Sequence, residues 1–276
     1  MTVLLANAIL TPNNLLINHG IVFDKTILEI LPNELLQERY PEIATDLGIG
    51  SIIFSGLVNA HVHLEFSANK STLHYGKFMM WLESVIESRD ELINNCHEEC
   101  ITKAIHQMLI TGTTAFGAIS SYGFDLDSCA KAPQKVVYFN ELIGSDPTMA
   151  DVLYSNFLER LFASQDINRE GFYPAIAIHS PYSVHRVLIQ KAINYAQKHS
   201  LKLTAHLFES RAEREWLDKN DGEFKPFFEH FLKQTKAAND AKDFLNFFNE
   251  IPTLFTHAIH ADEENHAQLS NGDHTV

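Results

Sequence analysis

The chain has 276 residues, of which 45% are hydrophobic and 20% are charged, so it can bury a large core and is neither disordered nor fibrous. Its formal net charge of −14 disfavours nucleic acid and membrane as partners, because so acidic a surface repels phosphate groups. Three cysteines argue against a disulfide framework, and no secretory leader or apolar run of about 18 residues is recognisable. We therefore expect a cytoplasmic globular protein.

The first fifty residues indicate a small β domain. Three short apolar segments, "TVLLANAIL", "LLINHGIVFD" and "KTILEILP", are separated by turn-forming residues. We assign residues 1–50 to this domain and residues 51–276 to a second domain with a different pattern.

The second domain alternates strand-like runs with helical patterns, which is typical of βα units around a parallel sheet. The predicted strands cover residues 52–62, 113–120, 135–142, 173–180, 201–208 and 252–259. Helices are predicted at residues 77–109, 184–199 and 223–236, and the charged stretch 218–250 is expected at the rim. Six units fit either an open doubly wound sheet or a (β/α)8 barrel that lacks two units; in the second case we expect a fragment of a longer protein.

Histidines gather at the ends of these predicted strands. His61 and His63 are two residues apart at the end of the first strand, so both imidazoles face the same side. Later strands end in further polar residues: His179, His206 with Glu209, and His257 with His260. Because the carboxyl ends of parallel strands meet at one edge, we expect these side chains to converge on one site. For each residue taken singly, a polar strand cap is the alternative.

The histidines at the predicted strand ends favour a catalytic metal site. Imidazoles without a thiolate cluster suit Zn²⁺ or Fe²⁺ with an open position for water. Such an ion lowers the pKa of bound water to about 7, and Glu209, three residues after His206, is the candidate proton shuttle. Cys96, His97 and Cys100 lie on one helical turn, but without a fourth ligand nearby we assign them to a partly buried helix face.

Several motifs are similar to those of one known family. The stretch "GLVNAHVHLEF" resembles the first-strand HxH motif of the amidohydrolase superfamily. "HLFES", followed by "THAIHADEE", resembles its deaminase and chlorohydrolase branch, which contains the adenosine-type and S-adenosylhomocysteine deaminases. The resemblance extends from Val3 to Gln268. It implies a (β/α)8 metallo-dependent hydrolase barrel, and it implies that residues 1–50 are part of a small β-sandwich.

The same resemblance implies a role for each motif residue. It implies three metal ligands: His61, His63 and His206. Glu209 matches the general acid/base, His257 matches the histidine that orients the attacking water, and His179 matches a position that contacts the substrate. Two-metal members carry a lysine at the end of the fourth strand, where this chain has Ile178, so a single divalent ion is implied.

One departure concerns the fourth metal ligand. In the family this ligand is an aspartate at the end of the eighth strand, and Asp273 follows the sixth predicted strand too early and in the wrong context to replace it. We therefore expect the chain to be inactive alone and assign the function to a longer parent protein.

The resemblance also suggests a substrate. "NAHVHLEFS", "KFMMWLESVI", "YFNELIG" and "HSPYSVH" are together most similar to the aminodeoxyfutalosine deaminases, which act on 6-amino-6-deoxyfutalosine in menaquinone biosynthesis. Phe78 and Trp81 provide either a wall for a flat heterocycle or the buried face of a helix. Glu141 binds ribose hydroxyls or caps a turn.

We therefore expect a hydrolase that deaminates a cyclic amidine, with a small-molecule purine nucleoside as its partner and a homodimer as an option. Two alternatives stay open. One is a related hydrolase of a cyclic amide or a chlorotriazine. The other is a catalytically inactive, truncated metal-binding protein.

Overall fold

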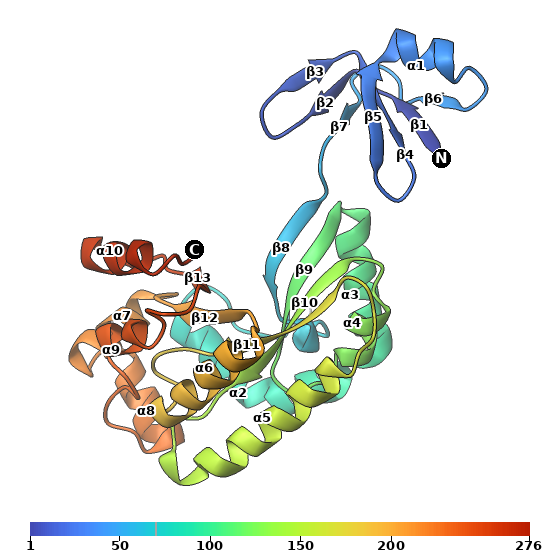
Figure 1. Ribbon diagram of the computed structural model, residues 1–276. Helices are drawn as coiled ribbons and strands as arrows, with labels where there is room; N and C mark the ends of the chain where they lie inside the picture. Colours follow the sequence, from blue (N-terminus) through green and yellow to red (C-terminus); the bar gives the residue numbers. More distant parts are fainter. Residues whose placement is uncertain (70) are drawn as a thin grey trace. The chain divides into compact units, whose positions relative to one another are not determined.

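The structure is a computed structural model that describes residues 1–69 and 71–276 (Figure 1). It divides into two compact units, Met1–Leu57 and Val58–Val276. The division falls seven residues after the predicted boundary at residue 50, because the predicted strand 52–62 is two strands. Assignment of the first unit to a β-sandwich remains a prediction.

Two small sheets form the first unit. One has the order β5-β4-β1-β6, with β1 Thr2–Leu5, β4 His19–Phe23, β5 Ile27–Pro32 and β6 Ala44–Asp46. The other has the order β3-β2-β7, with β2 Ala8–Leu10, β3 Leu15–Ile17 and β7 Ile52–Ile53. Helix α1, Asn33–Arg39, buries Leu36 against Val3, Leu5 and Val22, which form the core of the unit.

The second unit is built on a six-stranded sheet with the order β13-β12-β11-β10-β9-β8. Its strands are β8 Leu57–Val62, β9 Thr113–Ser120, β10 Lys135–Leu142, β11 Phe172–Ile178, β12 Leu203–Leu207 and β13 Thr253–His257. The pairings from β9 through β13 are parallel. The sheet is the nearly closed wall of a (β/α) barrel with six strands, so the barrel prediction is confirmed over the open doubly wound sheet.

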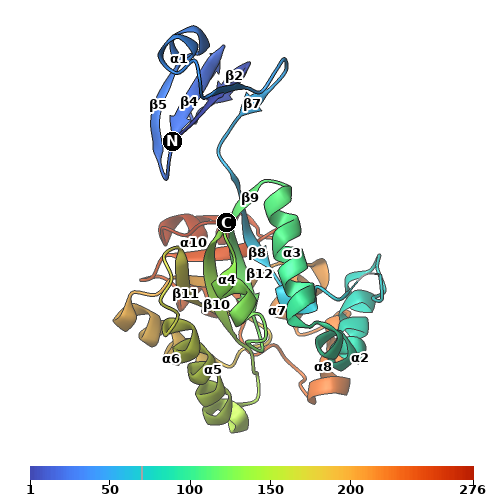
Figure 2. The ribbon, with the colours of Figure 1, turned by 90° about the vertical axis from the view of Figure 1, so that its right-hand side faces the viewer.

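Helices lie between the strands along the chain. They are α2 Phe78–Asn95, α3 Glu98–Ile110, α4 Leu126–Lys131, α5 Ala150–Gln165, α6 Arg186–His199, α7 Arg211–Lys219, α8 Phe224–Leu232, α9 Ala241–Asn246 and α10 Glu263–Asn271. Two short 3-10 helices, η1 Leu64–Phe66 and η2 Pro147–Met149, follow β8 and β10. Helix α3 packs against β9, α5 against β10 and β11, and α6 against β11 (Figure 2). No helix in the described ranges is long and apolar enough to cross a bilayer.

Two sequence expectations need correction. The predicted helix 77–109 is two helices, which meet at Cys96 and His97. The stretch 218–250 was expected at the rim as a charged insertion, but its aromatic residues belong to the main core: Phe224, Phe227, Phe228, Phe244 and Phe248. Its charged residues therefore occupy one face of short amphipathic helices whose other face is buried.

Candidate metal centre and active site

Four histidines come together at the carboxyl ends of the barrel strands. His61 lies near the end of β8 and His63 directly follows it, while His206 lies on β12 and His257 ends β13. The parallel register places Leu207 opposite His257, so β12 and β13 end at the same level. The sheet curls enough for its two outermost strands to meet there, since His61 Nδ1 lies 3.4 Å from Thr256 Oγ1 of β13.

The ring nitrogens of these histidines are as close as the ligands of one metal ion. His61 Nε2 lies 3.1 Å from Nε2 of His63 and 3.1 Å from Nε2 of His206. Two nitrogens bound to one zinc ion in tetrahedral geometry are about 3.3 Å apart. The ligand nitrogens of His61, His206 and His257 all lie within 4.8 Å of one another, and His63 joins this group through His61.

Hydrogen bonding between the rings does not account for these contacts. His206 donates its Nδ1 proton to the carbonyl oxygen of His179 at 2.8 Å, so the Nε2 of a neutral ring presents a lone pair. His61 Nε2 carries at most one proton, which two neighbouring nitrogens cannot both receive. A cation satisfies every lone pair at once, and the donor set therefore fits a divalent metal.

Burial keeps the imidazoles neutral, as metal ligation requires. Desolvation is the main cause that lowers the pKa of His61 to about 4, and the charge of His257 adds to it. Desolvation also lowers the pKa of His63 to about 3 and that of His206 well below its usual range. Neutral rings leave nitrogen lone pairs free for a cation near neutral pH.

Glu209 lies just past β12 and beside His257. Its Oε1 is 3.7 Å from His257 Nε2, and burial raises the pKa of its carboxyl to about 7. His257 and the following Ala258 have φ angles of 78° and 50°, in the left-handed region that side chains other than glycine adopt rarely. A carboxyl with this pKa can both accept and return a proton near neutral pH.

His179 and Glu141 both lie beside His206, and the ring centroids of His179 and His206 are 5.0 Å apart. His179 Nδ1 bonds Ser183 Oγ at 2.6 Å, and burial lowers the pKa of its ring to about 4. Glu141 is 2% exposed, and its Oε2 accepts a hydrogen bond from Ser121. Its Oε1 has no partner among the described residues and lies 4.0 Å from His206 Nδ1. The carboxylate is thus a buried acceptor available at the site.

Phe78 and Trp81 belong to a row of aromatic rings that leads to His179. The ring centroids of Phe78 and Trp81 are 5.5 Å apart, and Phe78 lies 6.0 Å from Phe224. Tyr182 lies 5.0 Å from Phe224 and 5.9 Å from His179. Phe78 is half-buried against the main core, so it has a packing role whether or not a ligand contacts it.

Two buried carboxylates that sequence reasoning missed hold the loops of the site. Glu65 follows His63 by two residues and accepts backbone N–H bonds from Ser121, Tyr122 and Phe124 at 2.8–3.1 Å. Glu213 accepts from two backbone amides of the segment after β12. The pattern Ser-x-x-Glu at residues 210–213 is a helix-capping signal that could have drawn attention to Glu213.

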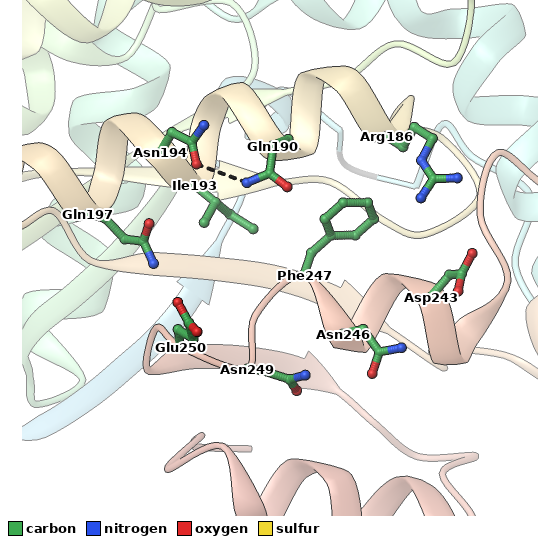
Figure 3. A pocket seen from close by; sticks show the side chains of 10 residues that line it. All are labelled: Arg186, Gln190, Ile193, Asn194, Gln197, Asp243, Asn246, Phe247, Asn249 and Glu250. Carbon is green, nitrogen blue, oxygen red and sulfur yellow. Dashed lines mark hydrogen bonds between the residues drawn. The ribbon is translucent and has the colours of Figure 1, made fainter.

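Other sequence candidates lie outside this cluster. His260 contributes backbone contacts, donating its N–H to the carbonyl of Phe208. Cys96 is buried at the junction of α2 and α3 and bonds the carbonyl of Leu64, in agreement with a packing role. Figure 3 shows a polar groove of about 450 Å³ between α6 and the segment from α9 to Glu250, and the described site residues do not line it.

Comparisons with known proteins agree with the geometry. The sequence profile described as "Amidohydrolase family" matches residues 52–273. An aminodeoxyfutalosine deaminase of Nitratiruptor sp. is 49% identical over 257 residues, which cover 93% of this chain and 64% of that protein. An adenosine deaminase of Helicobacter pylori is 31% identical, over 87% of this chain and 59% of that protein. The chain thus spans about three fifths of the length of these two relatives.

A solved structure is similar over nearly the whole chain. It is the aminofutalosine deaminase of Helicobacter pylori in complex with methylthio-coformycin, with a TM-score of 0.91 and 28% identity. The match covers 99% of this chain and 68% of that one. The fold of this chain is therefore shared with the matched part of that enzyme.

Proposed function

The chain belongs to the amidohydrolase family, and on that premise we propose that the histidine cluster is the single-metal centre of a deaminase. The observation that carries the proposal is that the Nε2 atom of His61 lies 3.1 Å from the Nε2 atoms of His63 and His206. The ligand nitrogen of His257 lies within 4.8 Å of those of His61 and His206, and the Glu209 carboxyl is 3.7 Å from His257. The proposed reaction replaces the amino group of an aromatic amino-heterocycle by oxygen and releases ammonia.

The proposed ligands are His61, His63 and His206, and the proposed ion is Zn²⁺, with Fe²⁺ as the alternative. When bound, such an ion supplies Lewis acidity that lowers the pKa of water at the site toward about 7. The carbonyl of His179 keeps His206 in the tautomer that this role needs, through the 2.8 Å bond to Nδ1.

Glu209 and His257 are the proposed proton-transfer residues. Glu209 takes a proton from the attacking water and delivers it to the ring nitrogen beside the reacting carbon. After water adds, the C–N bond to the amino group breaks, and the nitrogen leaves as ammonia with a second proton from the added hydroxyl. His257, whose Nε2 is 3.7 Å from Glu209 Oε1, orients the water and the departing group.

The proposed substrate is the adenine ring of a purine nucleoside, and more narrowly 6-amino-6-deoxyfutalosine of menaquinone biosynthesis. The identity of 49% to an aminodeoxyfutalosine deaminase supports this choice. Phe78 and Trp81 are proposed to stack on the flat ring system and His179 to contact it, while the free Oε1 of Glu141 is proposed to accept a hydrogen bond from a ribose hydroxyl. We also propose a cytoplasmic location, supported by three free thiols, and retain a homodimer as a prediction.

The test measures metal content and ammonia release on purified protein, both for this chain and for the longer parent protein to which the function is assigned. We expect about one equivalent of zinc or iron per chain, lost in His206→Ala and retained in the control His266→Ala, which changes an exposed histidine. Ammonia release is compared among 6-amino-6-deoxyfutalosine, adenosine, methylthioadenosine and S-adenosylhomocysteine. Ammonia from none of these, with turnover of a cyclic amide or chlorotriazine, would overturn the deaminase assignment. Metal binding with no turnover of any substrate would favour the inactive metal-binding alternative.

A further inference from the structure

Helix α7 begins directly after the segment that carries Glu209, and a side chain of its first turn hydrogen-bonds the backbone of that segment. Glu213 is 1% exposed, and its two side-chain oxygens accept hydrogen bonds from different backbone N–H groups. Oε1 accepts the N–H of Phe208 at 3.0 Å, and Oε2 accepts the N–H of Glu209 at 2.7 Å. One side chain thus fixes the peptide units on both sides of Phe208.

This arrangement differs from an ordinary helix cap. Ser210 caps α7, since its Oγ accepts the N–H of Glu213 at 3.1 Å. A glutamate at this position usually returns to the N–H of the capping residue itself. Here it reaches the two residues before the cap, where Phe208 has a left-handed φ of 51° although it is not glycine. Such a backbone conformation persists only when surrounding contacts hold it.

The next residue of α7 holds the segment that follows His257. Arg214 lies over the ring of Phe208 at 4.8 Å, and its Nη1 donates to Asn265 Oδ1 at 2.6 Å and to the carbonyl of His260 at 3.4 Å. The His260 N–H in turn donates to the carbonyl of Phe208 at 3.2 Å. Consecutive residues of one helix therefore bind the loop that carries Glu209 and the loop that follows His257.

We propose that Glu213 is a positioning residue that sets the 3.7 Å separation between the Glu209 carboxyl and the His257 imidazole, with Arg214 holding the other loop. The inference rests on the proposed function, in which Glu209 transfers protons. A carboxylate accepts two N–H groups at once, whereas a glutamine side chain of the same shape has one oxygen and one NH2 group. Glu213→Gln therefore releases one amide and turns a donor toward it.

The first experiment measures hydrogen exchange of the Phe208 and Glu209 amides by NMR. In the unaltered protein we expect both amides to be protected, although they lie outside regular secondary structure. In Glu213→Gln we expect at least one of them to exchange about tenfold faster or more, because the glutamine side chain has one acceptor oxygen for the two N–H groups and one hydrogen bond is lost. The control is Glu215→Gln, which removes the same charge from an exposed position of α7.

Unprotected amides in the unaltered protein, or unchanged exchange in Glu213→Gln, would overturn the proposal. The measurement on the unaltered protein decides the matter even if the variant does not fold. It also requires no turnover, so a failure of the proposed function is recognised separately, as absent ammonia release in every protein with amide exchange as expected.

The second experiment separates positioning from general stability. We expect Glu213→Gln to lower kcat by about tenfold or more while KM and metal content stay within about twofold. Because Glu213 acts through Glu209, adding Glu213→Gln to Glu209→Gln should cause little further loss. A full additional loss in the double variant, or loss of metal from Glu213→Gln, would contradict the positioning role.

Discussion

The Nε2 atom of His61 lies 3.1 Å from the Nε2 atoms of His63 and His206. His61 and His63 lie at the end of β8, whereas His206 comes from β12, far away in the chain. Burial is the main cause that lowers the pKa values of His61 and His63, and both rings are therefore neutral near neutral pH. Glu209 experiences the same burial with the opposite consequence, since desolvation raises the pKa of a carboxyl. One environment thus suits both the proposed ligands and the proposed proton-transfer group.

The Glu209→Gln substitution tests the proposed role of Glu209 in proton transfer. We expect ammonia release to fall by at least about a hundredfold, because general acid–base catalysis contributes that much or more. Metal content should not change, since Glu209 lies beside the ligand group and is not assigned to it. Glu229→Gln, at an exposed position of α8, serves as the control.

The pH dependence provides a second readout of the same substitution. Glu209 must be ionised to accept a proton, and its pKa is about 7, so kcat/KM should increase as the pH rises through 7. Retained turnover with the same pH profile in Glu209→Gln would remove Glu209 from the mechanism.

Individual site residues differed in how far the sequence could predict them. Alternation along a strand indicated that His61 and His63 share a side, and the strand-end position of His206 and Glu209 indicated a common edge. Glu65 gave no such signal, because its partners are backbone amides of residues 121–124. Backbone acceptor roles depend on how distant loops fold, and no residue pattern records them.

At the scale of elements, the close approach of β8 and β9 determines where His61 and His63 lie. Gly117 of β9 has no side chain at the point of approach. A Cβ added there would lie 2.4 Å from the carbonyl oxygen of Ala60 on β8, well inside van der Waals contact. Glycine is therefore required at position 117 for steric reasons. The carbonyl group that a side chain there would strike belongs to Ala60, the residue before the candidate ligand His61.

Replacing Gly117 with alanine should push β8 away from β9. We expect a free energy of unfolding lower by about 1–3 kcal/mol, as is typical for overpacked sites, measured by denaturant titration. We also expect weaker metal binding, because His61 and His63 move with β8. Thr114→Ala, at an exposed position of β9, should leave the metal affinity unchanged. Metal affinity preserved in Gly117→Ala would show that β8 is not held by this contact.

Element boundaries were less predictable than element types. Helical periodicity continues across Cys96 and His97, yet the chain leaves the helix there and begins another without a glycine or proline to mark the break. The apolar run 52–62 is likewise divided between β7 and β8, because residues 54–56 pair with neither sheet. Tertiary packing overrides local pattern at both places.

At the scale of the whole molecule, buried ionisable groups make stability depend on pH in opposing directions. Burial raises the pKa of several carboxyls from 4.5 to about 7: Glu65, Glu141, Glu209 and Glu213. Their stabilising contribution is complete below pH 4.5 and is lost as the pH rises through 7. Buried histidines such as His61 have pKa values lowered from 6.5 to about 4, so their contribution is lost as the pH falls through that range.

Between pH 4.5 and pH 6.5 the buried carboxyls and the buried histidines change the stability in opposite directions as the pH rises. Above pH 6.5, of these two groups of residues, only the carboxyls still titrate. We therefore expect the Tm of metal-free protein to fall as the pH rises from about 6.5 to about 8, measured by scanning calorimetry after chelation. Glu141→Gln should make this dependence shallower, because it removes one titrating carboxyl. A Tm that is constant or rises over this interval would contradict the prediction.

The fold class was predictable because six strand-like runs alternate with helical segments, and the family resemblance selected the barrel over the open sheet. The position of residues 218–250 was not, because their charge suggested a solvated rim although Phe224 and Phe248 are fully buried. Composition averages over both faces of a helix, whereas packing depends on each face separately.

His61 and Thr256 approach within 3.4 Å although β8 and β13 stand at opposite margins of the sheet. A cation shared by His61 and His206 would therefore crosslink the sheet near both margins. Metal binding and the curvature of the sheet are then coupled reciprocally. A change that moves β8 away from β13 lowers the affinity for the ion, and removal of the ion destabilises the curved sheet by the same coupling free energy.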